Sequence, residues 1–192
     1  FIVDDYSTKF KAVDVIKNHN ITFNLQLFYI STDRGFNIAG ACNLGAMKAR
    51  SNKIIRLDFD QQIQEKTINQ INILPVTTSN VYRVRKNDKK LYPSVLIFAR
   101  ALWELGFVWD EDFSPLYGWE DHYYIKVLQH YNINIDNITL DIINNSGGKT
   151  LNLDRKSMSL QSRKIYLEKL KQIKKPTNPI RFSYDMEYNN YI

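Results

Sequence analysis

The sequence predicts an α/β fold with a mainly parallel sheet flanked by helices, and two observations carry this prediction. Short, β-prone apolar runs alternate along the chain with segments whose apolar residues recur at helical spacing. One such run, Ile54 to Leu57, is followed directly by Asp58 and, two residues later, by Asp60. The carboxyl ends of strands in an open α/β sheet face the ligand crevice, so these two aspartates are candidate ligands.

The expected elements follow one another along the chain with turn residues between them. Ser7 or Thr8 can cap the first helix, whose residues Phe10, Val13 and Ile16 share one face. The expected strands are 1–3, 21–30, 54–57, 76–84 (one or two strands) and 138–143. The expected helices are one through 10–16, then 37–50, 94–105, 119–131 and 159–174.

Length and composition indicate one globular domain. The chain has 192 residues, of which 44% are hydrophobic and 13% aromatic, which is enough for a single core. The longest apolar runs are too short to span a membrane. Cys42 is the only cysteine, so an internal disulfide is excluded and a cytoplasmic location is expected. Because the chain enters a strand at Phe1, we expect it to lack upstream residues.

The net charge of +6 comes from the C-terminal part of the chain. Residues 1–148 carry 16 basic and 16 acidic groups, whereas residues 149–181 carry 10 basic and 2 acidic groups. A nucleic-acid site would interleave aromatic residues with these basic ones, and the segment shows no such stripe. We therefore expect a solvated helix that covers the core and no nucleic-acid partner, and contact with an anionic membrane surface stays open.

Asp58 and Asp60 have the residue type and the spacing of a metal site. Residues two apart on an extended strand point the same way, so both carboxylates can face one cation. Carboxylate oxygens suit Mg²⁺ or Mn²⁺, which usually share their coordination with substrate phosphates. Taken alone, a solvated acidic turn would explain the same two residues.

Four segments, in order, give the chain its resemblance to a known family. They are Ile2-Val3-Asp4-Asp5-Tyr6-Ser7-Thr8, then Asn43-Leu44-Gly45 followed by Leu57-Asp58-Phe59-Asp60, then Gly106-Phe107-Val108-Trp109-Asp110-Glu111-Asp112-Phe113, and Gly118-Trp119-Glu120-Asp121. Together they resemble the family 2 nucleotide-sugar-dependent glycosyltransferases with the GT-A (Rossmann-like) fold. The resemblance implies residues 1–148 as a GT-A catalytic domain and residues 149–192 as a basic helical extension packed on it.

On the donor side, the resemblance implies a nucleoside-diphosphate sugar, most simply a UDP-sugar. Asp5, and less directly Asp4, would accept a hydrogen bond from the nucleotide base. A helix-capping role is the alternative for Asp4. Asp58 would face the ribose or the metal, and Asp60 would bind Mn²⁺ or Mg²⁺, which stabilises charge on the leaving nucleotide.

On the acceptor side, the resemblance implies inverting transfer to a hydroxyl of a glycan or glycoconjugate. Asp121 would be the catalytic base that takes the hydroxyl proton, and Glu120 would orient the acceptor. Trp119 would offer its ring to a sugar. Without the resemblance, favourable charge in a helix's first turn would explain the two carboxylates, and Trp119 could be a core residue.

The chain also departs from the family pattern. The family's first strand and helix, upstream of Ile2, have no counterpart here. Cys42 stands where the family often has an arginine before the Asn-x-Gly motif, so that diphosphate contact is either missing or supplied by Arg34 or Arg50. A late-strand histidine ligand is absent, and His122 is the nearest substitute.

Two other functions stay open at the level of sequence. A nucleotide-sugar-binding module without turnover would keep the fold, although Asp58, Asp60 and Asp121 together speak against it. A sugar nucleotidyltransferase would share the fold class and the metal, but its Gly-rich basic loop is not visible in this sequence.

Overall fold

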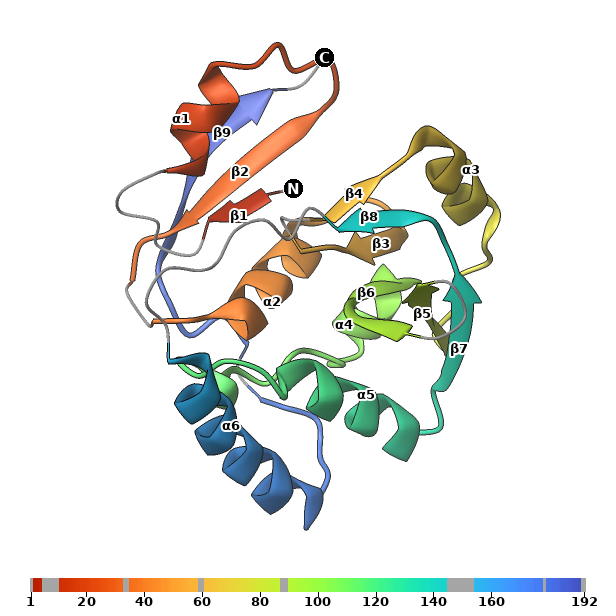
Figure 1. Ribbon diagram of the computed structural model, residues 1–192, viewed down its shortest axis with the longest axis vertical. Coiled ribbons are helices and arrows are strands. Elements are labelled where there is room, and N and C mark those ends of the chain that lie inside the picture. Colours follow the sequence, from red (N-terminus) through yellow and green to blue (C-terminus); the bar gives the residue numbers. More distant parts are fainter. Residues whose placement is uncertain are drawn as a thin grey trace.

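The computed structural model describes residues 2–4, 11–32, 35–58, 61–86, 90–144, 154–177 and 179–190. Strands and helices alternate over most of this length, and helices cover the faces of the sheets (Figure 1). The predicted α/β class is therefore confirmed. No helix in these ranges is long and apolar enough to cross a lipid bilayer.

The first sheet joins the two ends of the chain. Its strand order is β1 (Ile2–Asp4), β2 (Leu25–Ile30), β9 (Tyr184–Asn190). Side chains alternate along β2, and it buries apolar residues on both of its faces. Leu25 and Leu27 pack toward α1 (Ala12–Lys17), while Phe28 and Ile30 pack toward α2 (Ile38–Lys48).

The second sheet positions the candidate site. Its strand order is β3 (Lys53–Arg56), β6 (Lys90–Ala99), β5 (Asn80–Lys86), β7 (Asn134–Thr139). On one face Phe98 and Val81 pack against α5 (Glu120–His130), and on the other Ile97 and Tyr82 pack with Ile71 of α3 (Glu65–Ile73). A small third sheet pairs β4 (Gln61–Ile63) with β8 (Ile142–Asn144).

The strand pairing is mixed, so the prediction of a mainly parallel sheet was wrong. Among the described residues β1–β2 and β5–β7 are parallel, whereas β2–β9, β3–β6, β5–β6 and β4–β8 are antiparallel. The reason is that β6 follows β5 after only three intervening residues, which is too short for the crossover that a parallel pair requires.

One predicted helix is largely a strand. The helical spacing assigned to 94–105 is realised only in α4 (Arg100–Glu104), and the residues before it belong to β6. Val95, Leu96, Ile97 and Phe98 are all fully buried, because this central strand is covered on both faces. A continuous apolar run cannot be assigned to helix or strand from periodicity alone.

The C-terminal segment returns to the first sheet. The helix α6 (Arg155–Leu170) lies against α5, and the chain then runs back along the molecule to β9, beside β2 (Figure 1). The strand β9 was not predicted from the sequence. It is an edge strand that pairs antiparallel with β2. Its residues Tyr184 and Tyr188 contact the core on opposite faces of the sheet.

Candidate functional site

A buried arginine organises the charged cluster at the carboxyl end of β3. The Arg56 side chain is 8% exposed, and its Nη1 donates to Asp121 Oδ2 at 3.1 Å. Its Nη2 lies 3.2 Å from Asp58 Oδ1, and its Nε donates to Cys42 Sγ at 3.3 Å. One guanidinium thus joins a carboxylate at the end of β3 to a carboxylate at the start of α5.

The second oxygen of Asp121 is also held. Trp109 Nε1 donates to Asp121 Oδ1 at 3.0 Å, and the indole stacks on the ring of Tyr124 at a centroid distance of 4.1 Å. The backbone of Trp109 is fixed in turn by Asn43 of α2, which accepts from its N–H at 2.8 Å and donates to its carbonyl at 2.9 Å.

Three of the four sequence segments therefore meet in one chain of polar contacts. Hydrogen bonds link Asn43 to Trp109, Trp109 to Asp121 and Asp121 to Arg56, and an ion pair links Arg56 to Asp58. Because Asn43 and Trp109 are buried, this chain orders Asp121 without exposing its supports to water.

A second acidic residue, Glu111, connects the C-terminal segment to the loop between α4 and α5, which also contains Trp109. The carboxylate of Glu111, 2% exposed, accepts from Asn43 Nδ2 at 3.0 Å and from the backbone N–H groups of Ile180 and Arg181 at 2.6 and 3.0 Å. On the preceding residue, Asp110, the Oδ2 atom lies 2.8 Å from Nζ of Lys169 in α6. The loop between α4 and α5 is thus held by both α2 and the chain's last segment.

The first turn of α5 contains an unusual carboxyl group. Burial, followed by the nearby charge of Asp121, raises the pKa of Glu120 to about 7 from an ordinary 4.5. Its buried Oε2 has no hydrogen-bond partner in the described part of the chain. Burial likewise raises the pKa of the Cys42 thiol to about 11. Burial opposes the charge on Arg56, but Asp121, Cys42 and Asp58 together raise the pKa of its guanidinium.

The structure brings some of the predicted site residues together and assigns others a different contact. Asp58, Glu120 and Asp121 belong to the cluster around Arg56. The Asp4 carboxylate accepts from the backbone N–H of Ala12, the first residue of α1, at 2.8 Å. The N-cap residue of α1 is Lys11, so Asp4 contacts the start of the helix from eight residues upstream and not as a local N-cap. Asp5 and Asp60 lie outside the described residues, as does Arg34.

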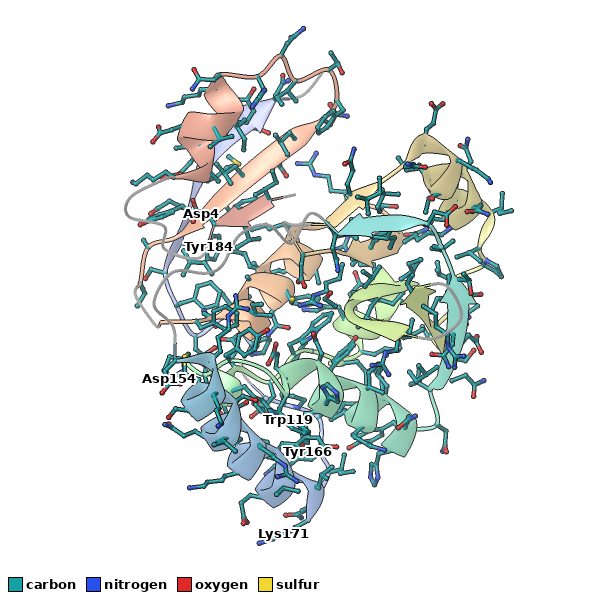
Figure 2. The ribbon with its side chains drawn as sticks, viewed as in Figure 1. Asp4, Trp119, Asp154, Tyr166, Lys171 and Tyr184 are labelled. Atoms are coloured by element: carbon teal, nitrogen blue, oxygen red, sulfur yellow. The ribbon has the colours of Figure 1, made fainter. Side chains whose placement is uncertain are left out.

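Trp119 faces the C-terminal helix. Its Nε1 donates to Ser159 Oγ at 3.1 Å, and its ring lies 5.0 Å from that of Tyr166. Figure 2 shows these two rings side by side, between α5 and α6. The guanidinium of Arg163 lies over the same indole, 5.8 Å from its centroid. Part of the aromatic face proposed for an acceptor sugar is therefore covered by α6.

The described residues do not by themselves make a metal site. They contain no group of three or more histidine, cysteine, aspartate or glutamate side chains placed to hold one ion, and His122 joins no such group. Asp58 is 37% exposed, and one of its oxygens lies on Arg56. Any cation bound here needs oxygen ligands from outside this set, from Asp60 or from substrate phosphates.

The sequence analysis missed Arg56, and the signal was present. A lone arginine inside Lys53-Ile54-Ile55-Arg56-Leu57, a run expected to be buried, requires a buried partner. The cation that contacts the Cys42 side chain is Arg56 of β3, whose Nε donates to the Cys42 Sγ. Arg50 instead lines a surface pocket with Phe28 and Tyr184.

Residues 1–71 match the family model described as glycosyl transferase family 2. The predicted resemblance to family 2 is confirmed over this part, which contains the first segment, the Asn43 motif and the Asp58 strand. No curated protein and no solved structure matches the chain.

The match to family 2 supports glycosyltransferase activity in general, with a nucleotide-sugar donor and an acceptor as substrates. The segments around Trp109 and Asp121 lie beyond the matched residues. Asn43 and Arg56, which lie within the matched residues 1–71, contact Trp109 and Asp121 and so link these two segments to the matched part.

Proposed function

We propose that this protein transfers a sugar from a nucleoside-diphosphate donor, a UDP-sugar, to a hydroxyl of a glycan or glycoconjugate, with inversion and with a Mn²⁺ or Mg²⁺ requirement. The observation that carries the proposal is the bridge made by Arg56. It couples Asp58, at the strand end where a donor diphosphate would bind, to Asp121, at the helix start where an acceptor would bind.

The proposed reaction is one displacement at the anomeric carbon. The acceptor oxygen forms a bond to that carbon from one side while the bond to the diphosphate oxygen breaks on the other, and the diphosphate leaves with the electron pair. The acceptor proton passes to Asp121. Trp109 keeps the carboxylate oriented, and the oxygen now facing Arg56 would exchange that contact for the acceptor hydroxyl.

Glu120 is a second candidate for the base, and two observations favour it. Its Oε2 accepts no hydrogen bond from any described residue, whereas both oxygens of Asp121 do accept one. Its pKa of about 7 is also close to the value that suits a general base at neutral pH. We assign the proton transfer to Asp121 and acceptor orientation to Glu120, and the variants below distinguish the two.

On the donor side, Asp58 and Asp60 would hold the metal and Asp4 and Asp5 would contact the base. When bound, the ion supplies positive charge at the departing diphosphate. This chain's own contribution there is the Arg56 guanidinium, which keeps Asp58 in place by their ion pair.

Calorimetry with a panel of nucleotide sugars and MnCl₂, together with donor hydrolysis, tests the proposal. Asp121→Asn should bind the donor as the parent does and lose turnover at least 100-fold, and Asp60→Ala should lose metal-supported binding. Asp136→Asn, on the exposed edge strand β7, is the matched control and should change neither.

Three results would contradict parts of this assignment. If Asp121→Asn keeps near-full turnover and Glu120→Gln loses turnover, the catalytic base is Glu120 and not Asp121. Unchanged donor binding by Asp60→Ala would remove the metal assignment. Donor binding by the parent chain without any hydrolysis or transfer would favour the binding module without turnover.

A further inference from the structure

Two arginines on β5 lie in the same row of the sheet as Arg56. Arg56 and Arg83 are both the register partners of Leu96, one from each side of β6. Residues in register on neighbouring strands project to the same face, so the two arginines share a face and their Cα atoms lie about 10 Å apart. Arg85, two residues further along β5, projects to this face as well.

This is the face that α5 covers. Leu96 and Val81 on it pack in the core with Tyr124, Val127 and Leu128. Both β3 and β5 run antiparallel to β6, so their carboxyl ends lie at one end of the sheet. Arg56, Arg83 and Arg85 are therefore gathered at that end. Arg56 contacts Asp121 in the first turn of α5, and the charge of Arg83 acts on Asp121 and His122 of the same turn.

Among the residues that the structure describes, the two β5 arginines have no counter-charge of their own. Within the described residues, neither guanidinium makes an ion pair, and the Nε of each is buried with no hydrogen-bond acceptor. Burial lowers the pKa of Arg83, and the positive charge of Arg85 lowers it further, against the attraction of Asp121. Buried donors left without an acceptor are unfavourable, and two neighbouring cations repel each other.

An oxyanion would satisfy both features at once. A guanidinium presents its donors in a planar fork that matches the oxygens of a phosphate or a carboxylate. The side chains of Arg83 and Arg85 are only partly buried, so they can be reached from solvent. Arg56 differs because Asp58 and Asp121 already neutralise it.

The position of the pair separates it from the donor end of the site. Asp58 follows β3, whereas β5 lies two strands away, on the far side of β6. The groups that feel the charge of Arg83 are Asp121 and His122, both in the first turn of α5. The pair is thus placed next to the proposed base rather than next to the proposed diphosphate position.

We propose that Arg83 and Arg85 form an anion subsite that holds an acidic group, phosphate or carboxylate, carried by the acceptor substrate. This rests on the proposed function, because it takes the Asp121 end of the site as the acceptor end. The acceptor is then a phosphorylated or acidic glycan or glycoconjugate, and the subsite places its hydroxyl beside Asp121.

His122 provides a readout that does not depend on activity. Burial and the charge of Arg83 lower the pKa of its imidazole. An anion bound to Arg83 screens that charge, so titration by NMR in sodium phosphate should raise the His122 pKa relative to sodium chloride of equal ionic strength. His122→Asn identifies the resonance among the three histidines. Sodium acetate is run in parallel to tell a phosphate preference from a carboxylate preference.

Arg83→Gln and Arg85→Gln should each weaken phosphate binding at least 10-fold, and Arg83→Lys, which keeps the charge, should retain part of it. Arg100→Gln is the matched control, because Arg100 lies at the other end of β6 and pairs with Glu104. It should bind phosphate as the parent does. Thermal unfolding of each variant verifies that it is folded.

Competition with UDP and MnCl₂ separates the two possible sources of the anion. Phosphate binding that survives saturating UDP supports the acceptor subsite. Displacement by UDP would assign the arginines to the donor diphosphate and overturn the inference, as would absence of any phosphate or acetate effect on His122. If no nucleotide binds to the parent chain but phosphate does, the proposed function fails while the anion site stands.

Discussion

Replacement of Glu120 by Gln should make the protein more stable at alkaline pH and should change it little in acid. The side chain is 6% exposed, and its pKa of about 7 instead of 4.5 means that the folded state resists its ionisation. The folded state therefore binds more protons than the unfolded state between these two values, and stability falls as pH rises through that window.

The size of the effect follows from the same two pKa values. At 1.36 kcal/mol per pH unit, ionisation of Glu120 reduces the free energy of unfolding by about 1 kcal/mol at pH 5 and about 3 kcal/mol at pH 8. Glutamine has nearly the same volume and no charge, so Glu120→Gln removes this penalty. The gain over the parent should grow by about 2 kcal/mol between pH 5 and pH 8.

Urea unfolding of the parent and the variant at pH 5, 6, 7 and 8 measures this difference directly. Other titrating groups contribute almost equally to both proteins, so the difference isolates Glu120 and its coupling to Asp121. Glu104→Gln is the control, since that exposed residue of α4 should show a difference that hardly depends on pH.

A gain that is flat across this pH range, within about 0.5 kcal/mol, would refute the reasoning. It would mean that Glu120 ionises in the folded protein at its ordinary pKa, so that burial and the charge of Asp121 do not act on it as the structure indicates.

Three further outcomes are expected. Arg56→Met should destabilise the protein by about 3–5 kcal/mol in urea unfolding, because it leaves two carboxylates without their buried partner. Asn43→Ala should cost about 3 kcal/mol, since it removes three buried hydrogen bonds and leaves the Trp109 N–H unsatisfied. Cys42, with a thiol pKa of about 11 in place of 9.0, should react with iodoacetamide at pH 8 about 100-fold more slowly in the folded than in the urea-unfolded protein.

Each of these has a result that would count against it. A stable Arg56→Met variant would mean that both carboxylates find water or other donors. An Asn43→Ala cost below about 1 kcal/mol would show that the loop at Trp109 is held by other contacts. Equal alkylation rates for the folded and unfolded states would place the Cys42 thiol in water.

Local patterns were sufficient to predict much of this structure from the sequence. The helix at α5 and the strand at β3 were predicted because their apolar spacing and length are distinctive. The run from Val95 to Phe98 was misassigned, because complete burial removes the alternation that distinguishes a strand. The strand β9 was missed because its pairing with β2 depends on residues more than 150 positions away.

The same distinction applies to the candidate site. Asp58, Glu120 and Asp121 were predicted from short segments that resemble a family. The position of Arg56 inside an apolar run indicated that it needs a buried partner, but its three partners could not be identified, because they are brought together by β3, α2 and α5. Arg83 and Arg85 gave no signal in the sequence, since an alternating charged strand is usually a solvated one.

The edge strand β9 has a practical consequence for anyone who shortens this protein. Without residues 184–190, β2 would present a row of bare amide and carbonyl groups, which is a template for self-association. Loss of Ile180 and Arg181 would also remove two backbone N–H donors from the buried carboxylate of Glu111. A version trimmed after α6 should therefore aggregate, and affinity tags are better appended beyond the last residue than substituted for the tail.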